Sequence, residues 1–330
     1  MSIEFAVTSL ADLQPRTVDG AHRTAEGRLR QITGLAVLTD RLGLDVFALG
    51  EHHSTDFAVS SPAVVLAAAA ARTTRVRLAS AVTVLSALDP VRVYEDFATL
   101  DVLSGGRAEL TVGRSAYPDP FALFGVPVEQ YGEVFAEHLD LLLRIRAGSP
   151  VTWRGRFRAP LSGAAVVPRA VQEPLPVWVG VGGTPASAER AGRLGLPMTL
   201  GYLGGPADGL RRLADIYREA AGPGGRLGVA VHLFAAADEA AARATYPYYR
   251  DFLRPKRPGA PGYVVSPEQF ATNEALMIGT SAHVAEKLAA LREVLRYDRI
   301  QALVDWGGLP ERLVEESVHR LAEEIAPALR

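Results

Sequence analysis

The stretch that decides the fold is residues 43–114, GLDVFALGEHHSTDFAVSSPAVVLAAAAARTTRVRLASAVTVLSALDPVRVYEDFATLDVLSGGRAELTVGR. It contains three short runs rich in Val, Leu and Ala, at 46–49, 76–84 and 108–112. Two longer stretches with helical character separate them, at 62–72 and 90–103. Continuous apolar runs are typical of parallel strands that are buried on both faces, and the longer stretches are typical of helical crossovers. The segment therefore predicts repeated β-α units.

The same alternation continues on both sides of this stretch. We expect further strands at 3–8, 177–181, 198–201, 227–234 and 300–304. Further helices are expected at 24–42, 131–146, 185–194, 207–221, 282–295 and 311–329. Eight strand–helix pairs favour a (β/α)8 TIM barrel of the α/β class, built as a single domain over residues 1–330. An open, doubly wound sheet alternates in the same way, so the strand count alone does not decide closure.

Two segments interrupt the alternation. The first, 149–176, is rich in proline and reads as an insertion after the fourth helix. The second, 238–276, follows the seventh strand and contains the aromatic run YPYYRDF at 246–252. Loops that follow the strands of a barrel carry its function, so we expect the second insertion to lie over the barrel mouth.

The composition narrows the class of function. The chain has a formal net charge of -2. It has no cysteine, and this excludes disulfides, thiolate nucleophiles and Cys-based metal sites. It has no basic run for nucleic acid or an acidic membrane, so a small-molecule substrate is expected. The N-terminal residues do not match a signal peptide, and the longest apolar run, 63–71, is too short to span a bilayer. A cytoplasmic protein is expected.

The motif GEHHS, residues 50–54, lies at the carboxyl end of the second strand. A His pair at a strand end is often only a solvent-facing or capping pair. The functional alternative is an imidazole that reaches the barrel mouth as a base or a hydrogen-bond donor. Because side chains alternate along an extended segment, Glu51 and His53 share one direction and His52 takes the other. A metal site is not predicted here, and no HExxH spacing occurs elsewhere.

The motif VGVGGTPASAERAG, residues 179–192, runs from a strand through Gly182 and Gly183 into a helix. Thr184 is a candidate N-cap, and Ser187 lies in the first helical turn. Free N–H groups and two hydroxyls at the positive end of a helix dipole suit a phosphate group. The alternative is an ordinary capped turn. The glycine spacing matches neither a dinucleotide fingerprint nor a P-loop.

Two further features bear on ligand binding. Arg114 follows the fourth strand, where a guanidinium could pair with a phosphate, although a solvated or ion-paired arginine is commoner. The third strand has small residues at its centre, Ala79, Ser80 and Ala81. These would let a flat ring approach the backbone, or would allow tight packing against the following helix.

Taken together, the order and spacing of these motifs resemble the bacterial luciferase family of flavin-dependent monooxygenases (luciferase-like monooxygenases). The matching motifs are EHH at 51–53, SSP at 60–62, DPVR at 89–92, SGGR at 104–107 and Arg114. The resemblance implies a (β/α)8 barrel that binds FMN at the carboxyl ends of its strands. Its phosphate would lie near Arg114 and the turn formed by Val181, Gly182, Gly183, Thr184 and Ser187.

The resemblance also implies roles for residues around the flavin ring. A non-proline cis peptide bond between Ala81 and Val82 would support the ring. His52 would be the catalytic base or hydrogen-bonding residue, and His53 would be structural. We expect Glu51, Tyr117 and Tyr202 to line the substrate pocket. The loops near 12–23 and 254–266 are candidate lids.

As for the reaction, the resemblance implies a two-component monooxygenase. A separate flavin reductase would supply reduced FMN, oxygen would add to the flavin to give a peroxide, and one oxygen atom would enter a small organic substrate. The stretch 115–125, SAYPDPFALFG, lacks the reactive cysteine of luciferases, so light emission is not expected. Hydroxylation, epoxidation and Baeyer–Villiger insertion all remain open.

Two alternatives stand beside this prediction. One is a deazaflavin-dependent oxidoreductase on the same barrel, which transfers hydride and ignores oxygen. The other is a non-catalytic flavin-binding subunit, against which the presence of His52 and Arg114 argues. The resemblance further implies a homodimer that packs through the helices near the second and third strands.

Overall fold

The computed structural model describes residues 2–14, 17–21, 23–115, 117–204, 207–254 and 262–330. Its centre is a closed barrel of eight parallel strands. In chain order the strands are β1 (Glu4–Ser9), β2 (Val46–Leu49), β3 (Arg77–Ser80), β5 (Ala108–Gly113), β8 (Val177–Val181), β9 (Met198–Tyr202), β10 (Leu227–Ala236) and β12 (Arg299–Leu303). The ring closes because β12 pairs in parallel with both β10 and β1. The predicted (β/α)8 barrel is confirmed.

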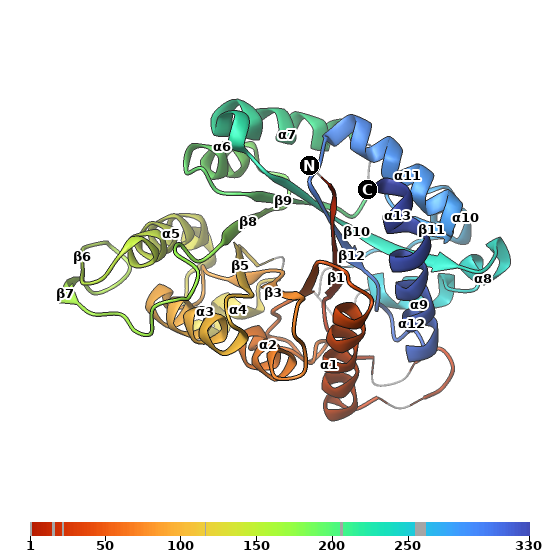
Figure 1. Ribbon diagram of the computed structural model, residues 1–330, viewed down its shortest axis with the longest axis horizontal. Coiled ribbons are helices and arrows are strands. Elements are labelled where there is room, and N and C mark those ends of the chain that lie inside the picture. The colour runs from red at the N-terminus through yellow and green to blue at the C-terminus, as the bar shows by residue number, and fades with distance from the viewer. Residues whose placement is uncertain (1, 15–16, 22, 116, 205–206, 255–261) are drawn as a thin grey trace.

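Helices surround the barrel on its outer side (Figure 1). They are α1 (Ala25–Arg41), α2 (Pro62–Ala70), α3 (Pro90–Ser104), α5 (Tyr131–Ala147), α6 (Pro185–Arg193), α7 (Ala207–Ala221), α11 (Ser281–Leu295) and α12 (Glu311–Arg320). Local sequence sets several starts: the side chains of Thr24, Asp89 and Thr280 each accept a first-turn backbone N–H. The helix expected at 311–329 is divided, since α12 is followed by a π-helical turn (Leu321–Ile325) and by α13 (Ala326–Leu329).

The two insertions form small elements of their own. The first contains an antiparallel pair, β6 (Val151–Trp153) and β7 (Leu161–Ala164). The second contains the short helices α8 (Glu239–Arg243), α9 (Tyr246–Leu253) and α10 (Pro267–Thr272). The sequence analysis did not anticipate α4 (Asp119–Phe124) or β11 (Met277–Thr280), which extends the sheet beside β10. No described helix combines the length and the apolar character needed to cross a membrane.

Alternation along the strands divides the barrel into an outer and an inner set of side chains. Outward residues such as Phe5, Val7, Phe47 and Leu49 are completely buried in the main core beneath the helices. The inner set includes a separate cluster of small residues, formed by Ala6, Val46, Ala48, Ala79 and Ala81. Four of these residues are completely buried, and Ala81, the one next to the end of β3, is partly exposed.

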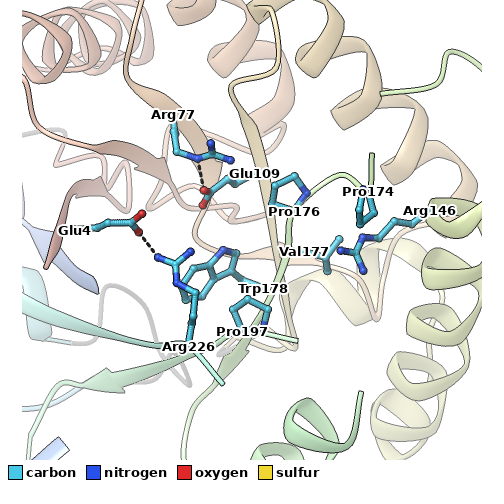
Figure 2. Close-up of a pocket in the computed structure, with 10 residues that line it drawn as sticks. All are labelled: Glu4, Arg77, Glu109, Arg146, Pro174, Pro176, Val177, Trp178, Pro197 and Arg226. Carbon is cyan, nitrogen blue, oxygen red and sulfur yellow. Dashed lines mark hydrogen bonds and ion pairs between the residues drawn. The ribbon is translucent and has the colours of Figure 1, made fainter. Parts of the chain in front are cut away.

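The amino end of the barrel interior is closed by charged residues. Arg299 of β12 is fully buried and bonds to Glu109 of β5 at 2.6 Å and to Glu4 of β1. Its guanidinium also lies 4.3 Å from the centre of the Trp178 ring. Figure 2 shows the adjoining cavity of about 310 Å³, into which Arg77 and Arg226 extend toward these carboxylates. This end of an α/β barrel serves stability, whereas function belongs at the opposite end.

We predict that Arg299→Met destabilises the protein by about 3 to 5 kcal/mol, because it leaves Glu109 buried with Arg77 as its remaining ion-pair partner. Burial alone would raise the pKa of Glu109, yet Arg299 and Arg77 together hold that pKa below its usual value. Urea unfolding measures the loss. The control is Arg312→Met, which removes an exposed pair with Glu316 and should change stability by less than about 0.5 kcal/mol. Equal effects of the two substitutions would contradict this account.

Candidate active site

Arg114 gathers three elements at the carboxyl end of the barrel. It follows β5, and its Nη2 donates to Thr184 Oγ1 at 3.0 Å and to Ser187 Oγ at 3.3 Å. Its Nη1 donates to the Tyr131 hydroxyl at 3.3 Å. Among the described side chains, no carboxylate forms an ion pair with this guanidinium. The structure therefore brings the predicted Arg114, Thr184 and Ser187 together around an unneutralised positive charge.

The turn that leads into α6 adds backbone donors to this cluster. Thr184 is the N-cap residue, but its side chain makes no capping bond and accepts from Arg114 instead. Pro185 occupies the first helical position and has no N–H. Gly183 has φ +137°, and a Cβ at Gly182 or Gly183 would meet nothing within 4 Å, so the turn is open on that side. A helix N-terminus, two hydroxyls and a free guanidinium form a chemically suitable phosphate site.

A second part of the site lies between β3 and β4 (Thr83–Val84). The strand predicted at 76–84 is interrupted here, and the peptide bond between Ala81 and Val82 is cis, as the resemblance implies. The Val82 side chain packs against the backbones of β5 and β8. A Cβ added at Gly113 or at Gly180 would come within 2.7 Å of it. These two glycines therefore hold the Val82 side chain close to the neighbouring strands.

His52 lies in an aromatic environment after β2. Its ring stacks on Phe57 with centroids 3.7 Å apart and meets the edge of Tyr117 at 5.6 Å. Its Nδ1 is buried without a partner among the described residues. Burial, with a smaller contribution from the charge of His53, lowers the pKa of His52 to about 3. The imidazole is therefore neutral near pH 7, which suits a hydrogen-bonding group better than a general base.

Glu51 and His53, the neighbours of His52, share one direction, as the alternation predicted. Glu51 Oε1 lies 2.9 Å from His53 Nε2, and burial raises the pKa of the Glu51 carboxyl. His53 also meets the edge of Phe124 at 4.9 Å. Glu51, His52 and His53 line a cavity of about 1010 Å³ between the segment 50–63, α3 and α4.

The three residues predicted to line the substrate pocket do not all lie in one place. Glu51 lines the large cavity, and Tyr117 contacts His52. Tyr202 pairs in register with Val231, whose side chain lies in the outer core, and its own side chain is 2% exposed. The structure therefore places Tyr202 on the outer side of β9, apart from the His52 group.

The candidate lids differ in what the structure describes. In the loop near 12–23, residues 15–16 and 22 lie outside the described residues, as do 255–261 in the loop near 254–266. The first loop is tied to the barrel rim by buried groups. Arg28 donates to the Asp12 carbonyl at 3.0 Å and pairs with Asp305 at 2.9 Å, while the Gly307 N–H donates to the Asp12 carboxylate. Burial raises the pKa of Asp305 to about 6, despite the charge of Arg28.

Two residues that the sequence analysis missed also lie at the carboxyl end. Tyr131 bonds to Arg114 from α5, and no local motif marks this contact. His232 lies on β10, where its Nδ1 is 3.0 Å from the Tyr249 hydroxyl of α9. The strand LGVAVHLF could have revealed it, because alternation gives His232 the same direction as Gly228 and Ala230.

Comparison with known proteins agrees with this geometry. The sequence profile of the luciferase-like monooxygenase family matches residues 3–298. The chain belongs to this family. It is 32% identical over 193 residues to 4-hydroxyprotoasukamycin monooxygenase from Streptomyces nodosus subsp. asukaensis, an alignment that covers 56% of this chain and 51% of that protein. The chain thus spans about half the length of several curated relatives, including two others matched over 54% of their length.

Solved structures share the fold. The monooxygenase RslO1 from Streptomyces bottropensis has a TM-score of 0.85 at 23% identity, covering 98% of this chain and 99% of that one. The oxygenating constituent of 3,6-diketocamphane monooxygenase from Pseudomonas putida, a type II Baeyer–Villiger enzyme solved with FMN, has a TM-score of 0.81 at 20% identity. That match covers 100% of this chain and 99% of the other.

We predict that His52 stays neutral from about pH 5.5 to about pH 8.5, because its buried ring cannot take a proton without losing the stacked environment. NMR of protein labelled with 13C at histidine Cε1 measures this, with the signal assigned by its loss in His52→Gln. The same residue should titrate near pH 6.5 in concentrated urea, which is the internal control. A folded-state midpoint above about pH 6 would contradict the buried environment described here.

Proposed function

We propose that this chain is an FMN-dependent, two-component monooxygenase that inserts one atom of O2 into a small organic substrate. The observation that carries the proposal is the Arg114 cluster. An arginine that no described carboxylate neutralises, two hydroxyls and a helix N-terminus meet at the mouth of a luciferase-like barrel. This donor set suits the dianionic phosphate of FMN.

The described residues fit the flavin. Arg114, Thr184, Ser187 and the glycine turn that follows Val181 would bind the phosphate. Ala81 and Val82 would contact the isoalloxazine ring, since small inner side chains and two close glycines hold this part of β3 against its neighbours. When bound in its reduced form, the flavin supplies the electrons that activate oxygen.

His52 would act beside the flavin as a neutral imidazole. Its low pKa supports a role in which it donates or accepts a hydrogen bond, and disfavours one in which it stores a proton. Phe57 stacks on one face of the ring and holds its orientation. Glu51 and Tyr117 would line the substrate side. Tyr202 would contribute less directly, because it lies on the outer side of β9.

The proposal includes partners. A separate reductase would supply the reduced FMN, and a second copy of the chain would pack against α2 and α3. Both helices leave apolar side chains exposed, which supports a homodimer: Val64 is 68% exposed on α2, and Val102 and Leu103 are 48% and 66% exposed on α3.

We predict that Arg114→Met weakens FMN binding by about 10- to 100-fold, because a charged hydrogen-bond partner of the phosphate is lost. Binding of riboflavin, which has no phosphate, should change by less than about 3-fold. Fluorescence titration of wild type and variant with both flavins measures the two affinities. Arg146→Met serves as the control, since Arg146 lies at the opposite end of the barrel.

Two outcomes would overturn the proposal. One is an Arg114→Met variant that binds FMN as wild type does. The other is a wild-type protein that binds a reduced deazaflavin and does not bind reduced FMN, which would favour the hydride-transfer alternative.

A further inference from the structure

His232 is a second buried imidazole whose side chain faces the barrel interior. It pairs in register with Leu303, and Ala230 pairs with Gln301, the next inner position after Arg299. A Cβ at Gly228, the other residue of this face, would meet Thr199 Oγ1 at 2.9 Å and the Trp178 ring at 3.5 Å. Both contacts lie inside the barrel, so the alternation places His232 on the inner face at the carboxyl end.

Helix α9 covers this imidazole and fixes one of its nitrogens. Nδ1 lies 3.0 Å from the Tyr249 hydroxyl, and Phe252 meets the ring edge-on at 5.4 Å. Tyr249 is 1% exposed, and no other acceptor for its hydroxyl proton is recorded among the described residues. A buried O–H without an acceptor is costly, so this proton is best placed on His232 Nδ1. The proton of the neutral ring then lies on Nε2.

Nε2 has no hydrogen-bond acceptor among the residues that the structure describes. His232 is 2% exposed, and Nε2 is buried without a partner among the described residues. Burial lowers the pKa of His232 to about 4, so the ring is neutral and carries a single N–H. An unsatisfied buried donor calls for an explanation, and a ligand acceptor is the explanation that a site at a barrel mouth offers.

The position of β10 indicates which ligand supplies the acceptor. Around the ring of eight strands, β10 is four positions from β3 in either direction, so the two strands stand opposite each other. The proposed flavin-contacting residues lie at the carboxyl ends of β3, β5 and β8, and His52 follows β2. His232 therefore lies across the mouth from the residues that would contact the flavin ring, on a wall that a substrate bound beside the ring would reach.

We propose that His232 Nε2–H donates a hydrogen bond to a carbonyl oxygen of the substrate, and that Tyr249 is the positioning residue that fixes this tautomer. The inference rests on the proposed function and deepens it by naming the substrate class. On the Nδ1 side, Tyr249 packs 5.1 Å from Trp306, which also contacts Phe234, and this buried packing holds the Tyr249 hydroxyl in place. The substrate class is thus a compound that carries a carbonyl group.

The first experiment needs no ligand. Histidine 15N NMR of the folded protein, with His232 assigned by its loss in His232→Gln, reports which ring nitrogen carries the proton. We expect the Nε2–H form in wild type and a mixture of tautomers in Tyr249→Phe, which keeps the aromatic ring and removes only the hydroxyl. A wild-type Nδ1–H form, or a tautomer unaffected by Tyr249→Phe, would overturn the proposal.

The second experiment compares two probes of nearly equal shape, cyclohexanone and methylenecyclohexane, of which only the ketone has an acceptor oxygen. Wild type with FMN bound should bind the ketone more tightly than the alkene. In His232→Phe the ratio of the two affinities should fall by about 10-fold. His232→Gln, whose amide N–H can replace Nε2–H, should retain most of it. No preference in wild type, or equal preference in His232→Phe, would contradict the proposal.

FMN affinity separates this inference from the proposed function. His232→Phe should bind FMN as wild type does, whereas Arg114→Met should lose FMN affinity. Loss of FMN affinity in His232→Phe would mean that Nε2 serves the flavin instead of the substrate, and would overturn the inference while leaving the proposed function standing.

Discussion

Inside the barrel, the guanidinium of Arg299 is bound to the carboxylates of Glu109 and Glu4. These ion pairs close the amino end of the barrel, and the inner residues toward the carboxyl end rest on them. Ion pairs fill the amino end of the interior. Large apolar side chains are therefore not needed to fill the carboxyl end. Small inner residues nearer the carboxyl end include Ala81, Gly113 and Gly180. The same polypeptide therefore has a rigid, charged base and a mouth with room for a ligand.

The mouth itself is electrostatically uneven. On the side of β5 and β8, Arg114 keeps a full positive charge that no described carboxylate neutralises. Elsewhere, burial holds His52 and His232 neutral, because a charged ring could not be solvated there. An anion is thus attracted to the Arg114 side of the mouth, whereas the charge of Arg28, elsewhere at the rim, is paired with Asp12 and Asp305. This charge distribution supports the proposed phosphate site beside β5 and β8.

The sequence predicted the parts of the fold that depend on local pattern. Strands β2 and β8 occupy the residues expected, 46–49 and 177–181, because continuous apolar runs mark strands buried on both faces. The hairpin within 149–176 was missed, since its pairing depends on contacts across a proline-rich loop rather than on periodicity. Tyr202 was expected at the substrate pocket, yet its register with Val231 turns it outward. The partnership of Arg114 with Tyr131 arises only when α5 packs against β5, and sequence spacing does not encode it.

The most direct test of the central claim is to mix the purified protein anaerobically with reduced FMN, add a pulse of oxygen and follow the flavin absorbance with time. A monooxygenase that binds reduced FMN at the Arg114 cluster should reoxidise the flavin much more slowly than free reduced FMN, because the closed site keeps water from the reacting flavin. Reoxidation at the rate of free flavin, with no binding of reduced FMN, would contradict the account.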